Sequence, residues 1–388
     1  MMLNFTSASA YPFGLDISDQ SLKLVQLNKI GNVIKIQALS KCGLPPGVIS
    51  NGIITNKAEL IKAIKRLIAE PIYGKVSSGE VVACLPESKT FIKLIEAQKS
   101  PNALADTIGS EIEKHVPLAI GEIYYDWQVI EELTDKYFIL IGAAPKDIVN
   151  QYTAMLDEAK LSPVALEIEP VAIARCLLKE EAPETKAEPA VSLNYGLMDI
   201  GADHTCMIFY SGNTILFTVS MPISGEKITA KISKALNLTA KQAEKAKIIC
   251  GLDDTKANGV IKEILAEMIK NLAAKIKEAI QYYDNYFSHR GPLNQILLSG
   301  GGANIINLEK IISQELPIKI KTADALININ ENRDKFNEFF IEKHSLDFMA
   351  TQISSNNKQK KISIKQNSSA TYATAIGLAL RGIFIDEI

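Results

Sequence analysis

The sequence predicts an α/β protein built from two lobes, on the evidence of three short motifs. Two of them share one pattern: an apolar strand ends in an aspartate, a turn of small or hydroxyl-bearing residues follows, and a second strand leaves the turn. The first copy occupies residues 13–25 and the second residues 197–208. The third motif is a strand at 296–298 that leads through Ser299 into the glycine triplet 300–302. Two copies about half a chain apart predict two related lobes.

Composition places the chain among ordinary globular proteins. It has 388 residues, of which 47% are hydrophobic and 22% charged, which suits two to four folding units of roughly 100–150 residues. A net charge of −2 gives no electrostatic footprint for nucleic acid. We expect no membrane-spanning helix, because every apolar run falls short of the ~18–20 residues needed, and no secretory signal at the start.

Cysteine and histidine usage predicts a cytosolic protein without a zinc site. The five cysteines have no C-x-x-C spacing, so we interpret them as buried reduced thiols. The four histidines are not spaced as metal ligands.

The first lobe is predicted from segments 11–87, 169–190 and 370–388. Residues 13–42 alternate as a three-stranded meander with a turn at 28–32. Asn56 is expected to cap a helix over 57–69 that has one apolar face, and 81–85 is a short buried strand. A helix begins at Glu169, and a closing helix of small residues over 370–382 is expected to pack closely on another helix.

Residues 88–168 are predicted to form an inserted subdomain. The order is a strand (90–96), a helix (102–115), two strands (124–131 and 137–144), a helix (146–159) and a strand (164–168). This β-α-β-β-α-β order is that of a ferredoxin-like unit. Trp127, Tyr124 and Tyr125 form either an exposed docking surface or the core of its small sheet.

A polar, acidic, proline-broken stretch at 179–190 predicts the boundary between the lobes. The second lobe is predicted from 191–224 plus 291–322, with the meander repeated over 197–219 and a hairpin turn at 211–213. Residues 225–290 form a helical subdomain, and 323–369 a polar insertion with one amphipathic stretch around 336–348.

The three motifs predict a nucleotide site. An aspartate at a strand end holds Mg²⁺ through water while the adjoining turn binds phosphate through backbone N–H groups, so Asp16 and Asp199 are the candidate metal residues. The simpler interpretation of either aspartate alone is a carboxylate that caps its turn. Around the first turn the candidate nucleotide-binding residues are Asp16, Ser18, Asp19, Gln20, Ser21 and Lys23.

The second lobe supplies the remaining candidates. They are Asp199, Gly201, Ala202, Thr205, Gly225, Glu226, Thr229, Glu244, Lys247, Gly300, Gly301, Gly302 and Asn304. Glycines after a strand allow close approach to a nucleotide or its sugar, although a tight strand-to-helix connection uses them equally. For Glu244 and Lys247 the simpler interpretation is a solvated helix face. The P-loop motif is absent from the sequence.

The motifs, in this order, resemble the phosphate-1, phosphate-2 and adenosine signatures of the actin, chaperone and sugar-kinase ATPase superfamily. Residues 169–174 and 373–379 are similar to its two connecting segments. Within that superfamily the chain resembles the PilM family, which is related to the cell-division protein FtsA. The segments that carry the resemblance are 13–27, 111–129, 167–177 and 375–381.

The resemblance implies an actin-like ATPase fold with ribonuclease H-like repeats and an inserted subdomain. It also implies ATP and Mg²⁺ as ligands, and a cytoplasmic scaffold role in type IV pilus assembly or a related secretion system. The implied partner is the N-terminal tail of a PilN-type inner-membrane protein, which links the chain indirectly to a PilO-type protein and to the inner face of the membrane. Self-association is a further implication, and Glu169 is implied to position an attacking water in an ATPase that is slow at most.

Two departures and three alternatives accompany this resemblance. The family usually has glycine where this chain has Ser18, and Asp19 follows it, which favours a degenerate member that binds no nucleotide. An FtsA-like division protein is an alternative, but that family carries a C-terminal amphipathic membrane helix, and we expect residues 381–388 to leave no room for one. A small-molecule kinase of the same fold would need a sugar-binding set, and the sequence offers none.

Overall fold

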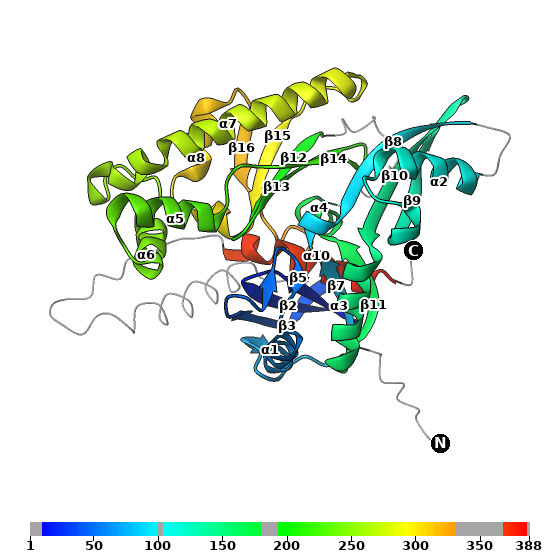
Figure 1. Cartoon of the computed structure of the whole chain (residues 1–388), viewed down its shortest axis with the longest axis horizontal. Coiled ribbons are helices and arrows are strands. Elements are labelled where there is room, and N and C mark those ends of the chain that lie inside the picture. The colour runs from blue at the N-terminus through cyan, green and yellow to red at the C-terminus, as the bar shows by residue number, and fades with distance from the viewer. Residues whose placement is uncertain (1–9, 100–103, 180–192, 331–367, 386–388) are drawn as a thin grey trace. The chain divides into compact units, whose positions relative to one another are not determined.

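The computed structural model describes residues 10–99, 104–179, 193–330 and 368–385, and the chain divides into two compact units (Figure 1). Unit 1 comprises Met1–Cys176, Asn328–Glu331 and Thr374–Ile388, and unit 2 comprises Leu177–Ile327 and Asn332–Ala373. Nearly all of the predicted linker, most of the polar insertion and its amphipathic stretch lie outside the described residues. In the described part of the chain, no helix has the length and apolarity to cross a membrane.

Unit 1 is organised around a sheet with the strand order β11-β7-β1-β2-β3-β6. These strands are β1 (Phe13–Ile17), β2 (Ser21–Ile30), β3 (Val33–Gly43), β6 (Tyr73–Gly74), β7 (Glu80–Leu85) and β11 (Ser162–Ile168). The predicted meander is confirmed, because β1, β2 and β3 pair antiparallel, while β7 lies parallel to β1 and to β11. A hairpin of β4 (Ile49–Ser50) and β5 (Ile53–Ile54) follows β3.

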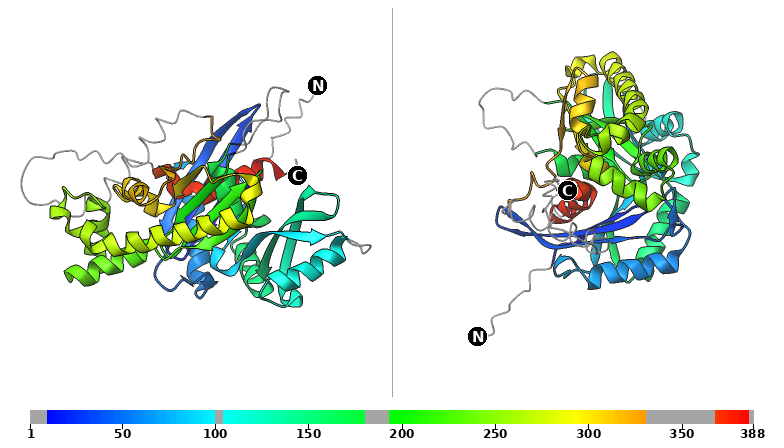
Figure 2. Two further views of the ribbon diagram at one scale, coloured as in Figure 1. Left: turned by 90° about the horizontal axis from the view of Figure 1, so that it is seen from above. Right: turned by 90° about the vertical axis from the view of Figure 1, so that its left-hand side faces the viewer.

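One face of this sheet is covered by α1 (Lys57–Ala69) and α3 (Lys146–Glu158), which lie opposite α10 (Ala373–Ile383) (Figure 2). Alternate strand residues such as Leu15 and Leu24 enter this apolar core. The predicted helix at 57–69 is confirmed, and the side chain of Asn56 accepts a hydrogen bond from the N–H of Glu59 as its cap.

The other face is covered by α4 (Glu169–Leu177) and α10, which meet the sheet and each other very closely. A Cβ on Gly14 would overlap the Ala375 carbonyl, and a Cβ on Gly377 would overlap the Ala172 carbonyl. The prediction of a closely packed helix of small residues is therefore confirmed.

The insertion contains β8 (Phe91–Gln98), α2 (Leu104–His115), β9 (Ile123–Glu132) and β10 (Lys136–Pro145), with β10 paired to both β8 and β9. The predicted element order is confirmed, but the ferredoxin-like grouping needs a correction. Helix α3 packs in the core of the unit 1 sheet, and β11 pairs with β7 rather than with the strands of the insertion. The physical reason is burial: Tyr152, Met155 and Leu156 of α3 are completely buried in that core.

Unit 2 repeats the meander in the strand order β16-β15-β12-β13-β14. These strands are β12 (Tyr195–Ile200), β13 (Thr205–Ser211), β14 (Thr214–Ser220), β15 (Gln295–Ser299) and β16 (Lys319–Thr322). As predicted, β12, β13 and β14 are antiparallel neighbours. The structure also pairs β15 parallel to β12.

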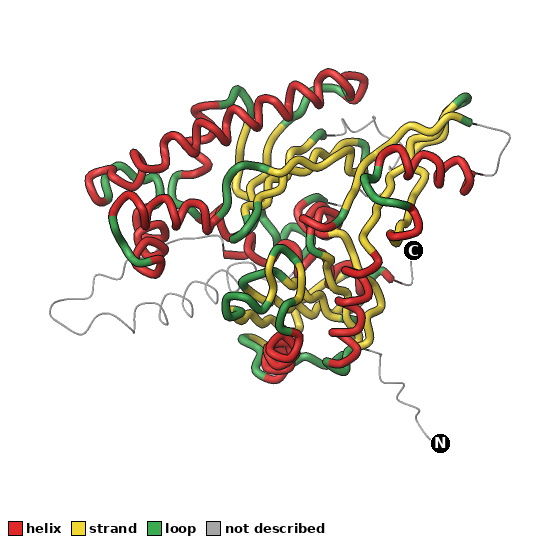
Figure 3. The backbone as a smooth tube through the Cα atoms, in the orientation of Figure 1, coloured by secondary structure: helices red, strands yellow, loops and turns green. Residues whose placement is uncertain are grey.

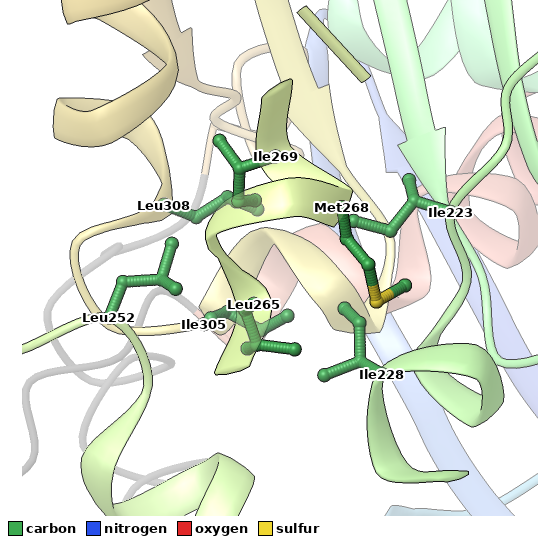
Figure 4. Close-up of a pocket in the computed structure, with 8 residues that line it drawn as sticks. All are labelled: Ile223, Ile228, Leu252, Leu265, Met268, Ile269, Ile305 and Leu308. Carbon is green, nitrogen blue, oxygen red and sulfur yellow. The ribbon is translucent and has the colours of Figure 1, made fainter. Parts of the chain in front are cut away.

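The helices of unit 2 are α5 (Gly225–Leu236), α6 (Ala240–Cys250), α7 (Val260–Tyr286) and α8 (Leu308–Glu315) (Figure 3). Tyr283 of α7 stacks on Phe209 of β13, with 5.8 Å between the ring centroids. Helices α5, α7 and α8 enclose a recess with only apolar side chains, which offers no hydrogen bond to a polar ligand (Figure 4). Its lining residues are Ile223, Ile228, Leu252, Leu265, Met268, Ile269, Ile305 and Leu308.

Short 3₁₀ turns complete the described elements. They are Glu87–Lys89, Ile120–Glu122, Ala257–Gly259, Ser288–Arg290, Gly301–Asn304 and Ser368–Tyr372.

Candidate functional site

A buried ion pair lies at the first strand end, in unit 1. Asp16 of β1 is directly opposite Lys23 of β2, and Lys23 Nζ donates to Asp16 Oδ2 at 2.6 Å. Asp16 is only 3% exposed. Burial raises the pKa of Asp16, the positive charge of Lys23 opposes that rise, and the negative charge of Glu169 adds to it.

Further polar side chains form a row with this ion pair, one on the neighbouring strand at each side. On β7, Cys84 Sγ lies 3.9 Å from Asp16 Oδ1, and burial together with the charge of Asp16 raises the pKa of the Cys84 thiol. On β3, Lys41 is the register partner of Lys23. Four neighbouring strands thus carry a polar row on the face that α4 and α10 cover.

The first turn is closed by its own hydrogen bonds. The N–H of Ser18 donates to the carbonyl of Ser21 at 3.1 Å, and the Ser18 hydroxyl donates to the same oxygen at 2.9 Å. The Asp19 carboxylate accepts from the N–H groups of Asn51 (2.6 Å) and Gly52 (3.1 Å). In this conformation Asp19 therefore holds the loop between β4 and β5. The exposed Gln20 accepts through its carbonyl from the N–H of Leu44 at 2.8 Å.

Glu169 begins α4 and lies within the electrostatic reach of Asp16. Thr374 Oγ1, in α10, donates to Glu169 Oε1 at 3.1 Å. The same structural element holds a second ion pair: Arg175 donates to both carboxylate oxygens of Glu167, each at 2.7 Å. Glu169 is thus oriented by a hydroxyl, while Arg175 ties α4 to β11.

The turn after the second strand end, in unit 2, is hydrogen-bonded to the start of α5. Ser299 Oγ donates to Asp199 Oδ1 at 2.8 Å. The N–H of Gly201 donates to the carbonyl of His204 at 3.0 Å, and a Cβ on Gly201 would lie 2.7 Å from that oxygen. The N–H groups of Gly225 and Glu226 then donate to the carbonyls of Gly201 (2.9 Å) and Ala202 (2.8 Å).

Thr205 provides a buried hydroxyl immediately after this turn. The residue is 1% exposed, and its Oγ1 has no hydrogen-bond partner among the described residues. Because a buried polar atom without a partner costs free energy, this hydroxyl fits the polar group of a ligand.

A polar network joins α5 to α6 beside the same turn. Lys247 Nζ donates to the carbonyl of Gly225 (3.1 Å) and to Thr229 Oγ1 (3.0 Å), and it lies 2.7 Å from Glu244 Oε2. Thr229 Oγ1 donates to that carboxylate at 2.5 Å. Lys247 is 8% exposed, so the interpretation of a solvated helix face is wrong for this lysine.

The glycine triplet is explained largely by packing on β12. Gly300 has φ of +77°, and a Cβ on it would lie 2.6 Å from the Ile200 carbonyl, while a Cβ on Gly302 would overlap the Ile200 side chain. Gly301 is exposed, and its nearest neighbour is Thr371 Cγ2 at 3.6 Å. Asn304 ends the 3₁₀ turn that follows.

The structure therefore gathers the predicted residues into two sets, one in each unit. The unit 1 set lies around Asp16 and Glu169, and the unit 2 set around Asp199, Gly225 and Lys247. Among the described residues, no three His, Cys, Asp or Glu side chains form a group that could hold a metal ion.

Sequence reasoning missed three polar residues of these sets. Lys41 is found by continuing the meander register from Lys23, and Ser299 directly precedes the glycine triplet. Thr374 carries no signal in the sequence, because its contact with Glu169 joins residues 205 positions apart.

Comparison with known proteins identifies relatives over almost the whole chain. The family model for type IV pilus assembly protein PilM matches residues 14–351. A solved PilM-PilN type IV pilus biogenesis complex contains a chain with 22% identity and a TM-score of 0.74, and the alignment covers 96% of this chain and 98% of that chain.

A second solved structure, the ethanolamine utilization protein EutJ from Carboxydothermus hydrogenoformans, has 14% identity and a TM-score of 0.51. The alignment covers 95% of this chain and 89% of the EutJ chain. At these identities the likeness shows the fold, and the predicted actin-like α/β fold is confirmed.

Proposed function

The chain belongs to the PilM family of type IV pilus assembly proteins, and on that premise we propose that it is a nucleotide-binding scaffold for the cytoplasmic N-terminal tail of a PilN-type inner-membrane protein. The match over residues 14–351 carries this proposal, because it includes both strand-end motifs and the insertion. It favours a pilus scaffold over the FtsA-like and kinase alternatives. Through its partner, the chain would act at the cytoplasmic face of the inner membrane.

The β9 strand of the insertion suits an extended peptide. Among the described strands it stands last in its order, so one of its edges has no described strand beside it and could pair with an added strand. Tyr124 and Tyr125 of β9 are 47% and 42% exposed, which favours the docking surface over the core interpretation for these two side chains. Trp127 is half-buried against the core of the insertion instead.

The charge of β9 also suits a membrane-anchored partner. The strand carries Asp126, Glu131 and Glu132 and no lysine or arginine. Cytoplasmic segments next to a membrane span are enriched in lysine and arginine, so a tail of this kind complements the carboxylates of β9, of which Glu132 is already paired with Lys99. Lys146 of α3, 5.5 Å from the Tyr124 ring centroid, fixes one end of the surface.

One set of side chains in each unit supports the proposal of nucleotide binding. In unit 2, the Thr205 hydroxyl after the Gly201 turn is buried without a partner among the described residues, and Lys247, paired with Glu244, donates to the carbonyl of Gly225 at the start of α5. In unit 1, Lys23 lies on the strand that leaves the first turn, where its ammonium is paired with Asp16. The Ser18 amide already donates within its turn, so the side chains would make the main contacts there.

The roles of the carboxylates follow from their surroundings. In each unit the strand-end aspartate, Asp16 or Asp199, would hold Mg²⁺ through water. Glu169, oriented by Thr374, would position a water near Asp16.

Two binding experiments test the proposal. In calorimetry with Mg·ATP we expect saturable binding to the full chain, and no heat at millimolar nucleotide would refute nucleotide binding. In fluorescence anisotropy, a labelled PilN-type tail peptide should bind the wild type and lose affinity when Tyr124 and Tyr125 are both changed to alanine. Tyr286→Ala is the matched control, because Tyr286 is 65% exposed in unit 2.

A further inference from the structure

Lys41 is a lysine on the inner face of unit 1 that the strand-end motif does not include. It lies on β3 directly opposite Lys23, while Lys23 in turn lies opposite Asp16. The side chains of Leu24 and Cys42 face the core under α1, so Lys23 and Lys41 both project from the opposite face of the sheet. The row thus places two ammonium groups on neighbouring strands.

The counter-charge in this row is unevenly distributed. Asp16 is paired with Lys23 at 2.6 Å, and the negative charge of Glu169 also acts on Asp16. Lys41 has no ion pair or hydrogen bond through its ammonium with any described residue. The ammonium at the β3 end of the row therefore has no direct counter-ion among the described residues, and the charge of Asp16 acts on it only from a distance.

That positive end lies beside the first turn. Ser21, the last residue of the turn, pairs with Gly43 only two positions beyond Lys41. The N–H of Leu44 also donates to the carbonyl of Gln20 at 2.8 Å. The end of β3 and the first turn are thus fixed to each other, and any group held at the turn lies within the reach of a lysine side chain on β3.

We propose that Lys41 is a second phosphate-binding residue, which acts with Lys23 to favour a nucleoside triphosphate over a diphosphate. This inference rests on the proposed nucleotide binding and adds a residue to it. A terminal phosphate brings the additional negative charge that an isolated ammonium requires. The partial burial of Lys41 supports the same conclusion, since this burial and the charge of Lys23, opposed by the charge of Asp16, lower the pKa of Lys41 to about 8 in the free protein.

Variants of the full chain test the proposal with Mg·ATP and Mg·ADP in calorimetry. Lys41→Met should weaken ATP binding about ten- to hundredfold, as expected for a lost charge-assisted contact, and ADP binding should change much less. Lys41→Arg should retain most of the ATP affinity. Lys35→Met is the matched control, because Lys35 is an exposed lysine on the same strand, and it should bind as the wild type does.

The outcomes separate this inference from the proposed function. If the wild type binds ATP and Lys41→Met has the same ATP-to-ADP affinity ratio, the role of Lys41 is refuted while nucleotide binding stands. If the wild type binds no nucleotide, thermal unfolding with tripolyphosphate decides the question. If tripolyphosphate raises the melting temperature of the wild type but not that of Lys41→Met, the phosphate site stands. If the melting temperatures of both proteins respond equally, the proposal is refuted.

Discussion

Lys23 and Asp16 form a buried ion pair across β1 and β2, with 2.6 Å between Lys23 Nζ and Asp16 Oδ2. Removal of one partner leaves the other charge buried and unpaired, which costs about 3–5 kcal/mol. We expect Lys23→Met to lower the free energy of unfolding by about that amount at pH 8 in urea denaturation. Lys35→Met should leave it unchanged.

The same variant should respond to pH. Burial already holds the pKa of Asp16 above its unfolded value, and loss of Lys23 raises it further. A raised folded-state pKa means that the folded protein binds more protons, so stability falls as pH rises through that window. The destabilisation by Lys23→Met should therefore be smaller at pH 5 than at pH 8. An equal loss at both values would contradict the buried pairing.

Lys41 should reduce the stability of the free protein. Its pKa is lowered from 10.5 to about 8, mainly by burial, so the folded state loses its proton first and stability rises with pH between these two values. Below that window, Lys41→Met should raise the free energy of unfolding by about 3 kcal/mol at pH 7. Above pH 10 the gain should vanish. Denaturation at both pH values checks this, and a gain independent of pH would argue against a buried charge.

Thr205 should show opposite effects on stability and binding. Its hydroxyl is buried without a partner among the described residues, so Thr205→Val removes an unsatisfied polar group and should stabilise the free protein by about 1 kcal/mol. The same change should weaken Mg·ATP binding several-fold, since the nucleotide would lose a hydrogen bond. Differential scanning calorimetry measures the stability and titration calorimetry the ATP affinity. If Thr205→Val raised both or lowered both, this role of Thr205 would be contradicted.

Gly377 should tolerate no side chain. A Cβ there overlaps the backbone carbonyl of Ala172, so Gly377→Ala forces α4 and α10 apart and should cost about 1–3 kcal/mol or more. Gly79→Ala is the control, because its Cβ would meet no atom within 4 Å. Similar melting temperatures for the two variants would contradict the close crossing of these helices.

The sequence predicts most of the fold because the signals are local. The meander alternates from Phe13 onward, Asn56 caps α1, and the second meander repeats the first. The ferredoxin-like grouping failed because the order of elements does not say which sheet a strand joins. Strand β11 pairs with β7, about 80 residues earlier in the chain, and buried side chains of α3 decide that pairing.

The residues of the candidate site likewise include some that local sequence predicts and others that depend on contacts between distant segments. Asp16, Lys23 and Asp199 follow from the repeated motif, since a strand end and its turn are contiguous. The place of Lys41 beside Lys23 depends on the pairing register of β2 and β3. The partners of Asp19 were unforeseeable for another reason: its carboxylate accepts from the N–H groups of Asn51 and Gly52, some 32 residues away.

The binding of the tail peptide tests the central claim most directly. Anisotropy of a labelled PilN-type N-terminal tail should rise saturably as the full chain is added in the presence of Mg·ATP, and Tyr286→Ala should bind equally well. The Tyr124→Ala, Tyr125→Ala double variant should bind at least tenfold more weakly, which corresponds to a loss of about 1.4 kcal/mol. If the wild type leaves the anisotropy of the peptide unchanged at concentrations of full chain up to the millimolar range, the chain is not a scaffold for such a tail.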